Sequence, residues 1–83
     1  MRTANYEEVL SEVVALLERV VKSTEKISEE TELINDLGLG SLQVMEFVQE
    51  VEDTFDISFP LNDLSKIRTV RAFVLQIQKE IEV

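Results

Sequence analysis

The residues best suited to chemistry in this 83-residue chain surround Ser41. Both glycines of the chain, Gly38 and Gly40, lie just before this serine, and the apolar spacing that follows predicts a helix beginning at Ser41. A serine at a helix start can act as the N-cap, a contribution of about 1 kcal/mol. It can also carry a phosphodiester, because the free N–H groups and the positive end of the helix dipole stabilise an anion there.

A nucleophilic role for Ser41 has less support. The chain has no histidine and no cysteine, so the commonest general base, the commonest metal ligand and thiolate chemistry are all missing. The stretch GLGSL does not complete the G-x-S-x-G turn of hydrolases, because Gln43 replaces the last glycine. We therefore expect no catalytic residue and no metal site. The phosphodiester fits better, since two glycines allow a tight turn and leave room around the hydroxyl.

The charge of the chain is concentrated around Ser41. The net charge is −9, and no lysine or arginine occurs between Lys26 and Lys66, so the middle of the chain carries the acidic excess. Nucleic acid and anionic membranes are poor partners for such a protein, whereas basic proteins are good ones. The sequence also lacks an apolar run long enough to span a membrane and lacks the apolar core of a signal peptide, so we expect a cytoplasmic protein.

The elements that must position Ser41 are predicted to be helical. No repeat, linker or alternating strand pattern interrupts the chain, which favours a single all-α domain over residues 1–83. We expect a small bundle of three main helices and one short helix, with a long first loop. The expected elements are a helix over 5–22, a loop over 23–40, a helix over 41–55, a short helical turn over 61–65 and a helix from about 69.

Apolar residues at three- and four-residue steps give each predicted helix a core face. Asn5 and Glu8 resemble a capping box at the start of the first helix. The predicted core residues are Tyr6, Val9, Val13, Leu16, Leu17 and Val20 in the first helix; Ile27, Leu33, Ile34 and Leu37 in the loop; Val44, Phe47, Val48, Val51 and Phe55 in the second helix; and Val70, Phe73, Val74, Ile77 and Ile81 in the last.

The helix that begins at Ser41 has a second face. At about 100° per residue, Leu42 lies opposite the core stripe and Met45 at its margin. Leu42 shares the far side with Glu46, Gln49 and Asp53. Exposed apolar residues are common and need no function. An apolar patch ringed by carboxylates would nevertheless suit partners with basic surfaces, and methionine adapts to several of them.

The stretch DLGLGSLQVMEFVQEVEDTFDISFP, from Asp36 to Pro60, resembles the signature of the acyl carrier proteins and, more widely, of phosphopantetheine-binding carrier domains. The later stretch LNDLSKIRTVRAFV is similar to another passage of that family, and the resemblance covers nearly the whole chain. The matching positions are Asp36, Leu37, Gly38, Ser41, Leu42, Glu46, Glu52, Phe55, Ile57, Pro60, Ile67, Thr69 and Val70.

The resemblance implies a four-helix bundle with a long first loop. It implies that Ser41 receives 4′-phosphopantetheine from coenzyme A, through a phosphopantetheinyl transferase that uses Mg²⁺, and that the thiol of this arm holds acyl groups as thioesters. Such a carrier catalyses nothing itself and presents its cargo to acyl-loading and acyl-transferring enzymes with basic docking surfaces. We expect a monomer, because a carrier must visit several partners. The positions that such partners contact correspond to Leu42, Met45, Glu46, Gln49 and Asp53.

The chain departs from the family at three positions. Gly40 stands where an aspartate usually precedes the serine, and Phe47 and Leu64 stand where many members carry smaller apolar residues near the acyl cavity. A fuller core leaves less room, which favours a short, branched or polar cargo, or a weakly sequestered one. It also favours a specialised lipid or polyketide pathway over housekeeping fatty-acid synthesis. A carrier of amino-acyl groups and an unmodified interaction module remain alternatives. A calcium sensor is less well supported, since no D-x-D-x-D-G loop occurs.

Overall fold

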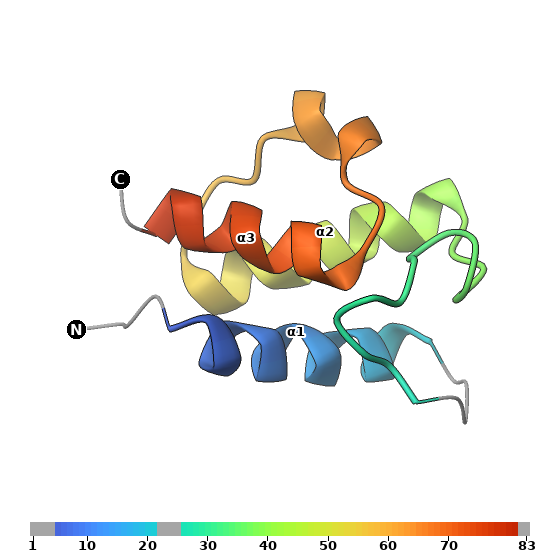
Figure 1. Cartoon of the computed structure of the whole chain (residues 1–83). Helices are drawn as coiled ribbons and strands as arrows, with labels where there is room; N and C mark the ends of the chain where they lie inside the picture. Colours follow the sequence, from blue (N-terminus) through green and yellow to red (C-terminus); the bar gives the residue numbers. More distant parts are fainter. Residues whose placement is uncertain (1–4, 22–25, 82–83) are drawn as a thin grey trace.

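The computed structural model describes residues 5–21 and 26–81, apart from the side chains of Leu61, Asp63 and Ser65. In these ranges the chain forms three α-helices and one 3₁₀ helix, and no strand (Figure 1). The elements are α1 (Tyr6–Val20), α2 (Ser41–Phe55), the 3₁₀ helix η1 (Leu61–Lys66) and α3 (Val70–Ile81). The all-α prediction is confirmed.

Helix α1 begins where the sequence predicts. The side chain of Asn5 accepts hydrogen bonds from the backbone N–H groups of Glu7 and Glu8, at 2.9 and 3.2 Å, and so caps the helix. The helix ends at Val20, and the predicted end at Lys22 lies outside the described residues. Along its inner face Val9, Val13, Leu16 and Leu17 are buried against the other two helices, as expected from their spacing, and the other two predicted core residues of this face are half-buried.

The core lies between α1, α2 and α3, and its centre is aromatic. Phe73 of α3 packs against Phe47 of α2, with ring centroids 4.7 Å apart, and stacks on Phe59, with centroids 4.4 Å apart. No polar or charged side chain is buried among the described residues. The three helices are therefore held by apolar burial and ring contacts, and the polar chemistry of the molecule is left on its surface.

The connection between α1 and α2 is bound to the start of α3 through its backbone. The N–H of Leu33 donates to the carbonyl of Arg68 at 2.9 Å, while the N–H groups of Val70 and Arg71 donate to Thr31 and Glu29 at 3.0 and 2.7 Å. Thr69 caps the same helix end, since its Oγ1 accepts from the N–H of Ala72 at 3.1 Å. In Figure 1 this connection accordingly reaches the N-terminal end of α3.

One predicted core residue of the connection is wrong. Ile27 and Leu33 are buried and Leu37 is half-buried, but Ile34 is 65% exposed. Leu39, which the sequence did not single out, is only 4% exposed. The bond of Leu33 to Arg68 fixes which way this turn faces, so Leu33 points into the core and its neighbour Ile34 points out.

The segment after α2 contains the predicted short turn. Helix α2 ends at Phe55, and Asp56 closes it in the left-handed conformation, with φ 56°. After Pro60 the chain forms the 3₁₀ helix η1, which runs one residue further than the predicted turn over 61–65. The described residues thus form three α-helices and this one 3₁₀ helix.

No helix in the described ranges combines the length and the apolar character that crossing a lipid bilayer requires.

Candidate functional site

Ser41 is exposed to solvent at the first position of α2. Gly40, not Ser41, is the N-cap residue, and it has no side chain that could accept a hydrogen bond from the N–H groups of the first turn. The interpretation of Ser41 as a structural cap is therefore wrong: its side chain does not satisfy the helix end. A helix leaves its first N–H groups without partners inside the helix, and the first turn of α2 has no acidic residue to offset their positive potential.

The two glycines before Ser41 have different backbone requirements. Gly38 has φ +66°, a left-handed conformation that glycine adopts without strain. Gly40 has φ −85° and ψ 174°, an extended conformation open to any residue. A Cβ atom at Gly40 would meet only Oε1 of Gln43, at 3.9 Å. The tight turn predicted from both glycines thus depends on Gly38 alone, while Gly40 leaves open space beside the serine.

Gln43 fixes the approach of the chain to α2. Its side-chain oxygen accepts a hydrogen bond from the N–H of Gly40 at 3.1 Å, and the carbonyl of Gly40 accepts from Val44 at 3.0 Å. This residue is the one that breaks the hydrolase motif in the sequence, and its role here is structural. These bonds fix the backbone just before Ser41, while the surroundings of Ser41 stay open.

The loop that delivers the chain to Ser41 is also anchored by side chains. The hydroxyl of Tyr6 donates to the Glu29 carboxylate, and Arg71 pairs with Glu29 at 3.5 Å and with Glu30 at 3.8 Å. The bonds from Tyr6 and Arg71 hold the pKa of Glu29 below its usual value. Burial, followed by the bond to Glu29, raises the pKa of Tyr6. Three segments far apart in the sequence are joined at this point.

An apolar groove of about 540 Å³ opens beside Ser41. Its walls come from the connection between α1 and α2, from α2 itself and from the segment around η1. The sequence suggested Phe47 and Leu64 as residues near an acyl cavity, and Leu64 does line this groove. Phe47 does not; it is fully buried against Phe73 and belongs to the core. The residues that line this apolar groove are Leu33, Ile34, Leu39, Gly40, Ser41, Val44, Met45, Leu64 and Ile67.

The five predicted docking residues are all exposed on α2, but they divide into different surroundings. Leu42 is 75% exposed and Met45 46% exposed, and only Met45 lines the apolar groove. Glu46, Gln49 and Asp53 line a separate shallow groove that also contains Arg19 and Val20 from the end of α1. The sequence did not indicate this contribution of α1. Among the described residues no acidic group has the arrangement of a metal site.

Comparison with known proteins yields consistent matches. Residues 10–77 match the family described as the phosphopantetheine attachment site. An acyl carrier protein of Exiguobacterium sp. is 37% identical over 76 residues, which cover 90% of this chain and 96% of the relative. An acyl carrier protein of Thermotoga maritima is 34% identical over 79 residues, which cover 94% and 98%.

The fold comparison extends the match to three dimensions. A solved structure described as an acyl carrier protein from Mycobacterium tuberculosis matches with a TM-score of 0.77 and 28% identity. The alignment covers 83% of this chain and 93% of that one.

Proposed function

Because the chain belongs to the acyl carrier protein family, whose members carry phosphopantetheine and are not enzymes, we propose that Ser41 is its attachment residue. The observation that supports this assignment is the exposed hydroxyl of Ser41 at the uncapped N-terminus of α2. The family match shows the cofactor, and the geometry supports this serine as the group that receives it.

The reaction that loads the carrier is a phosphoryl transfer. The Ser41 oxygen forms a bond to the β-phosphorus of coenzyme A, the bond between the two phosphates breaks, and 3′,5′-adenosine bisphosphate leaves. The hydroxyl proton passes to a base of the transferase. The phosphodiester that results lies at the positive end of α2, where its negative charge is stabilised.

The function of the loaded protein follows from its surfaces. The thiol of the arm holds an acyl group as a thioester, and the apolar groove beside Ser41 accepts the aliphatic part of that group. Partner enzymes with basic surfaces dock on α2 through Leu42, Met45, Glu46, Gln49 and Asp53. The half-buried Leu64 forms part of the wall of this groove, and its size supports a specialised carrier of short, branched or polar acyl groups. We propose that this carrier acts in the cytoplasm. In this proposal η1 takes the place of the short helix of a four-helix carrier fold.

Mass spectrometry tests the attachment residue. Incubating the chain with coenzyme A, Mg²⁺ and a broad-specificity transferase is expected to add one phosphopantetheine to the wild-type protein and none to Ser41→Ala. Ser11→Ala is the matched control, because Ser11 is an exposed serine of α1 and its loss leaves loading unchanged. A correctly folded wild-type chain that gains no mass would instead indicate an unmodified interaction module.

A further inference from the structure

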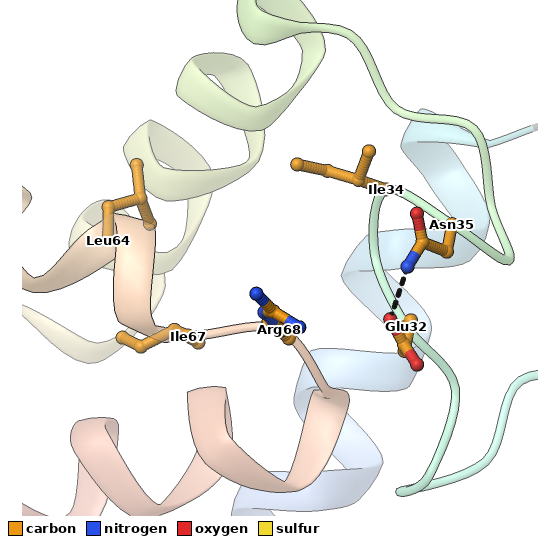
Figure 2. A pocket seen from close by; sticks show the side chains of 6 residues that line it. All are labelled: Glu32, Ile34, Asn35, Leu64, Ile67 and Arg68. Carbon is orange, nitrogen blue, oxygen red and sulfur yellow. Dashed lines mark hydrogen bonds between the residues drawn. The ribbon is translucent and has the colours of Figure 1, made fainter.

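The apolar groove continues into a second, more polar pocket of about 340 Å³ (Figure 2). Ile34, Leu64 and Ile67 line both spaces, so the two adjoin along one apolar wall. The second pocket adds Glu32, Asn35 and Arg68. An acyl chain that enters the apolar groove beside Ser41 and follows this wall therefore reaches the charged residues of the second pocket.

Arg68 is the cation of this end. Its carbonyl is held by the N–H of Leu33 at 2.9 Å, which fixes the backbone from which the side chain extends. Figure 2 shows the side chain of Arg68 between Ile67 and the pair formed by Glu32 and Asn35. The described side chains provide no ion-pair partner for Arg68, whereas Arg71, a few residues on, pairs with Glu29 and Glu30.

Glu32 is the group that opposes an anion here. Its Oε1 accepts a hydrogen bond from Nδ2 of Asn35 at 2.7 Å, which occupies part of its carboxylate (Figure 2). It forms no ion pair with Arg68 within the described part of the chain, so the guanidinium keeps its donors for another acceptor. A guanidinium binds a carboxylate through two parallel hydrogen bonds, which neutral groups do not reproduce.

We propose that Arg68 selects a tethered acyl group that ends in a carboxylate. This inference rests on the proposed attachment at Ser41. The methylene chain of the cargo lies along Ile34, Leu64 and Ile67, and its terminal carboxylate binds the guanidinium of Arg68. A neutral acyl chain of the same length gains the apolar contacts but not the charged ones, so the far end of the groove discriminates between them.

The experiment compares two cargoes of equal carbon number on the full chain. A transferase loads Ser41 from adipoyl-coenzyme A or from hexanoyl-coenzyme A, and mass spectrometry verifies each loaded form. Thermal unfolding is then expected to give the adipoyl form a midpoint about 3 °C above the hexanoyl form, the size of a partly exposed charged contact in a small domain. The side-chain Nε–H resonance of Arg68 is expected to shift only in the adipoyl form.

Three variants separate the charged contact from other effects. In Arg68→Gln the difference between the two cargoes is expected to vanish, and in Glu32→Gln it is expected to grow because the opposing carboxylate is gone. Arg71→Gln is the matched control: it breaks the pairs with Glu29 and Glu30, so it lowers the midpoints of both forms and leaves their difference unchanged.

The outcomes also distinguish this proposal from the attachment itself. If no cargo is loaded, the assignment of Ser41 fails. If both cargoes load but the adipoyl form is no more stable, or if its advantage survives in Arg68→Gln, the selection by Arg68 is overturned and the carrier function stands.

Discussion

The N-terminal ends of α2 and α3 are built in opposite ways. At α3, Thr69 caps the helix and the carbonyls of Glu29 and Thr31 accept from the next N–H groups, so the end is closed by the protein itself. At α2, Gly40 provides no side chain, the first turn has no acid, and Ser41 faces solvent. A helix end whose donors are satisfied internally stabilises the fold, whereas an end left open is available to an anion.

The largest expected effect on stability comes from Gly38, in the turn that leads into α2. Gly38→Ala places a Cβ on a left-handed residue and is expected to lower the free energy of unfolding by about 1–2 kcal/mol. No atom crowds this position, so the loss reports backbone strain alone. Urea unfolding measures it, with Gly40→Ala as the matched control, since Gly40 is extended and should tolerate alanine. Equal losses in both variants would contradict the assigned difference between the glycines.

A second pair of variants compares the two helix ends directly. Thr69→Ala removes the cap of α3 and is expected to lower the free energy of unfolding by about 1 kcal/mol. Ser41→Ala removes a hydroxyl that caps nothing and should change stability by only a few tenths of a kcal/mol, or about as much as an ordinary surface substitution. A Ser41→Ala variant as destabilised as Thr69→Ala would return the serine to a structural role.

The contacts of Glu29 with Tyr6 and Arg71, near the N-terminal end of α3, predict that the stability of the fold depends on pH. The pKa of Glu29 is lower in the folded protein than in the unfolded chain. Its contribution to the free energy of unfolding is therefore present above the pKa of the unfolded chain and is lost as the pH falls through the pKa of the folded protein. The thermal midpoint of the wild type is therefore expected to exceed that of Glu29→Gln at pH 7, with the gap closing in acid. A gap that stays constant down to pH 2 would show that the carboxylate charge is not what stabilises the anchor.

The partner of Glu29 gives the opposite behaviour at high pH. The pKa of Tyr6 is raised in the folded protein. Its contribution to the free energy of unfolding is therefore present below the ordinary pKa of tyrosine and is lost as the pH rises through the pKa of the folded protein. Tyr6→Phe is expected to be less stable than the wild type at pH 7 and to converge with it in strong alkali, by the same thermal measurement.

The smallest expected effect on stability comes from closing the open end. Gly40→Asp fits the extended backbone and the free space, and replacing a glycine cap by aspartate should stabilise the fold by a few tenths of a kcal/mol. Because the family usually has aspartate at this position, loading by a transferase is expected to become several-fold faster. Mass spectrometry over time measures this, with Gly40→Asn as the uncharged control. If Gly40→Asn accelerates loading equally, capping rather than charge is responsible.

The sequence predicts what depends on local pattern. The bounds of α2 at Ser41 and Phe55 follow from apolar spacing, and the buried faces of all three helices follow from the same periodicity. The exposure of Leu42 and Met45 follows from their angle to the core stripe. These features require no knowledge of which segments meet.

The remaining features depend on contacts between distant segments. Ile34 is exposed although it was predicted to be buried, and Leu39 is buried although the sequence did not single it out. The connection has no periodicity, and the direction in which it faces is decided by the bond between Leu33 and Arg68. The same holds for the hydrogen bond between Tyr6 and Glu29 and for the pocket that Ile34 and Leu64 share. The members of each pair lie far apart in the sequence, so no local sequence pattern predicts their contact. Gly40 rather than Ser41 is the N-cap because of the backbone angles at these residues, and the sequence does not determine those angles.

The absence of any cation along α2 has a consequence for self-association. Leu42 and Met45 lie bare on a helix whose charged residues are all acidic, from Glu46 to Asp53. Two copies meeting through this surface would press like charges together, and that repulsion offsets the apolar attraction between them. The same carboxylates would attract the basic docking surface that we propose for partner enzymes, so this helix is better suited to other proteins than to a second copy of itself.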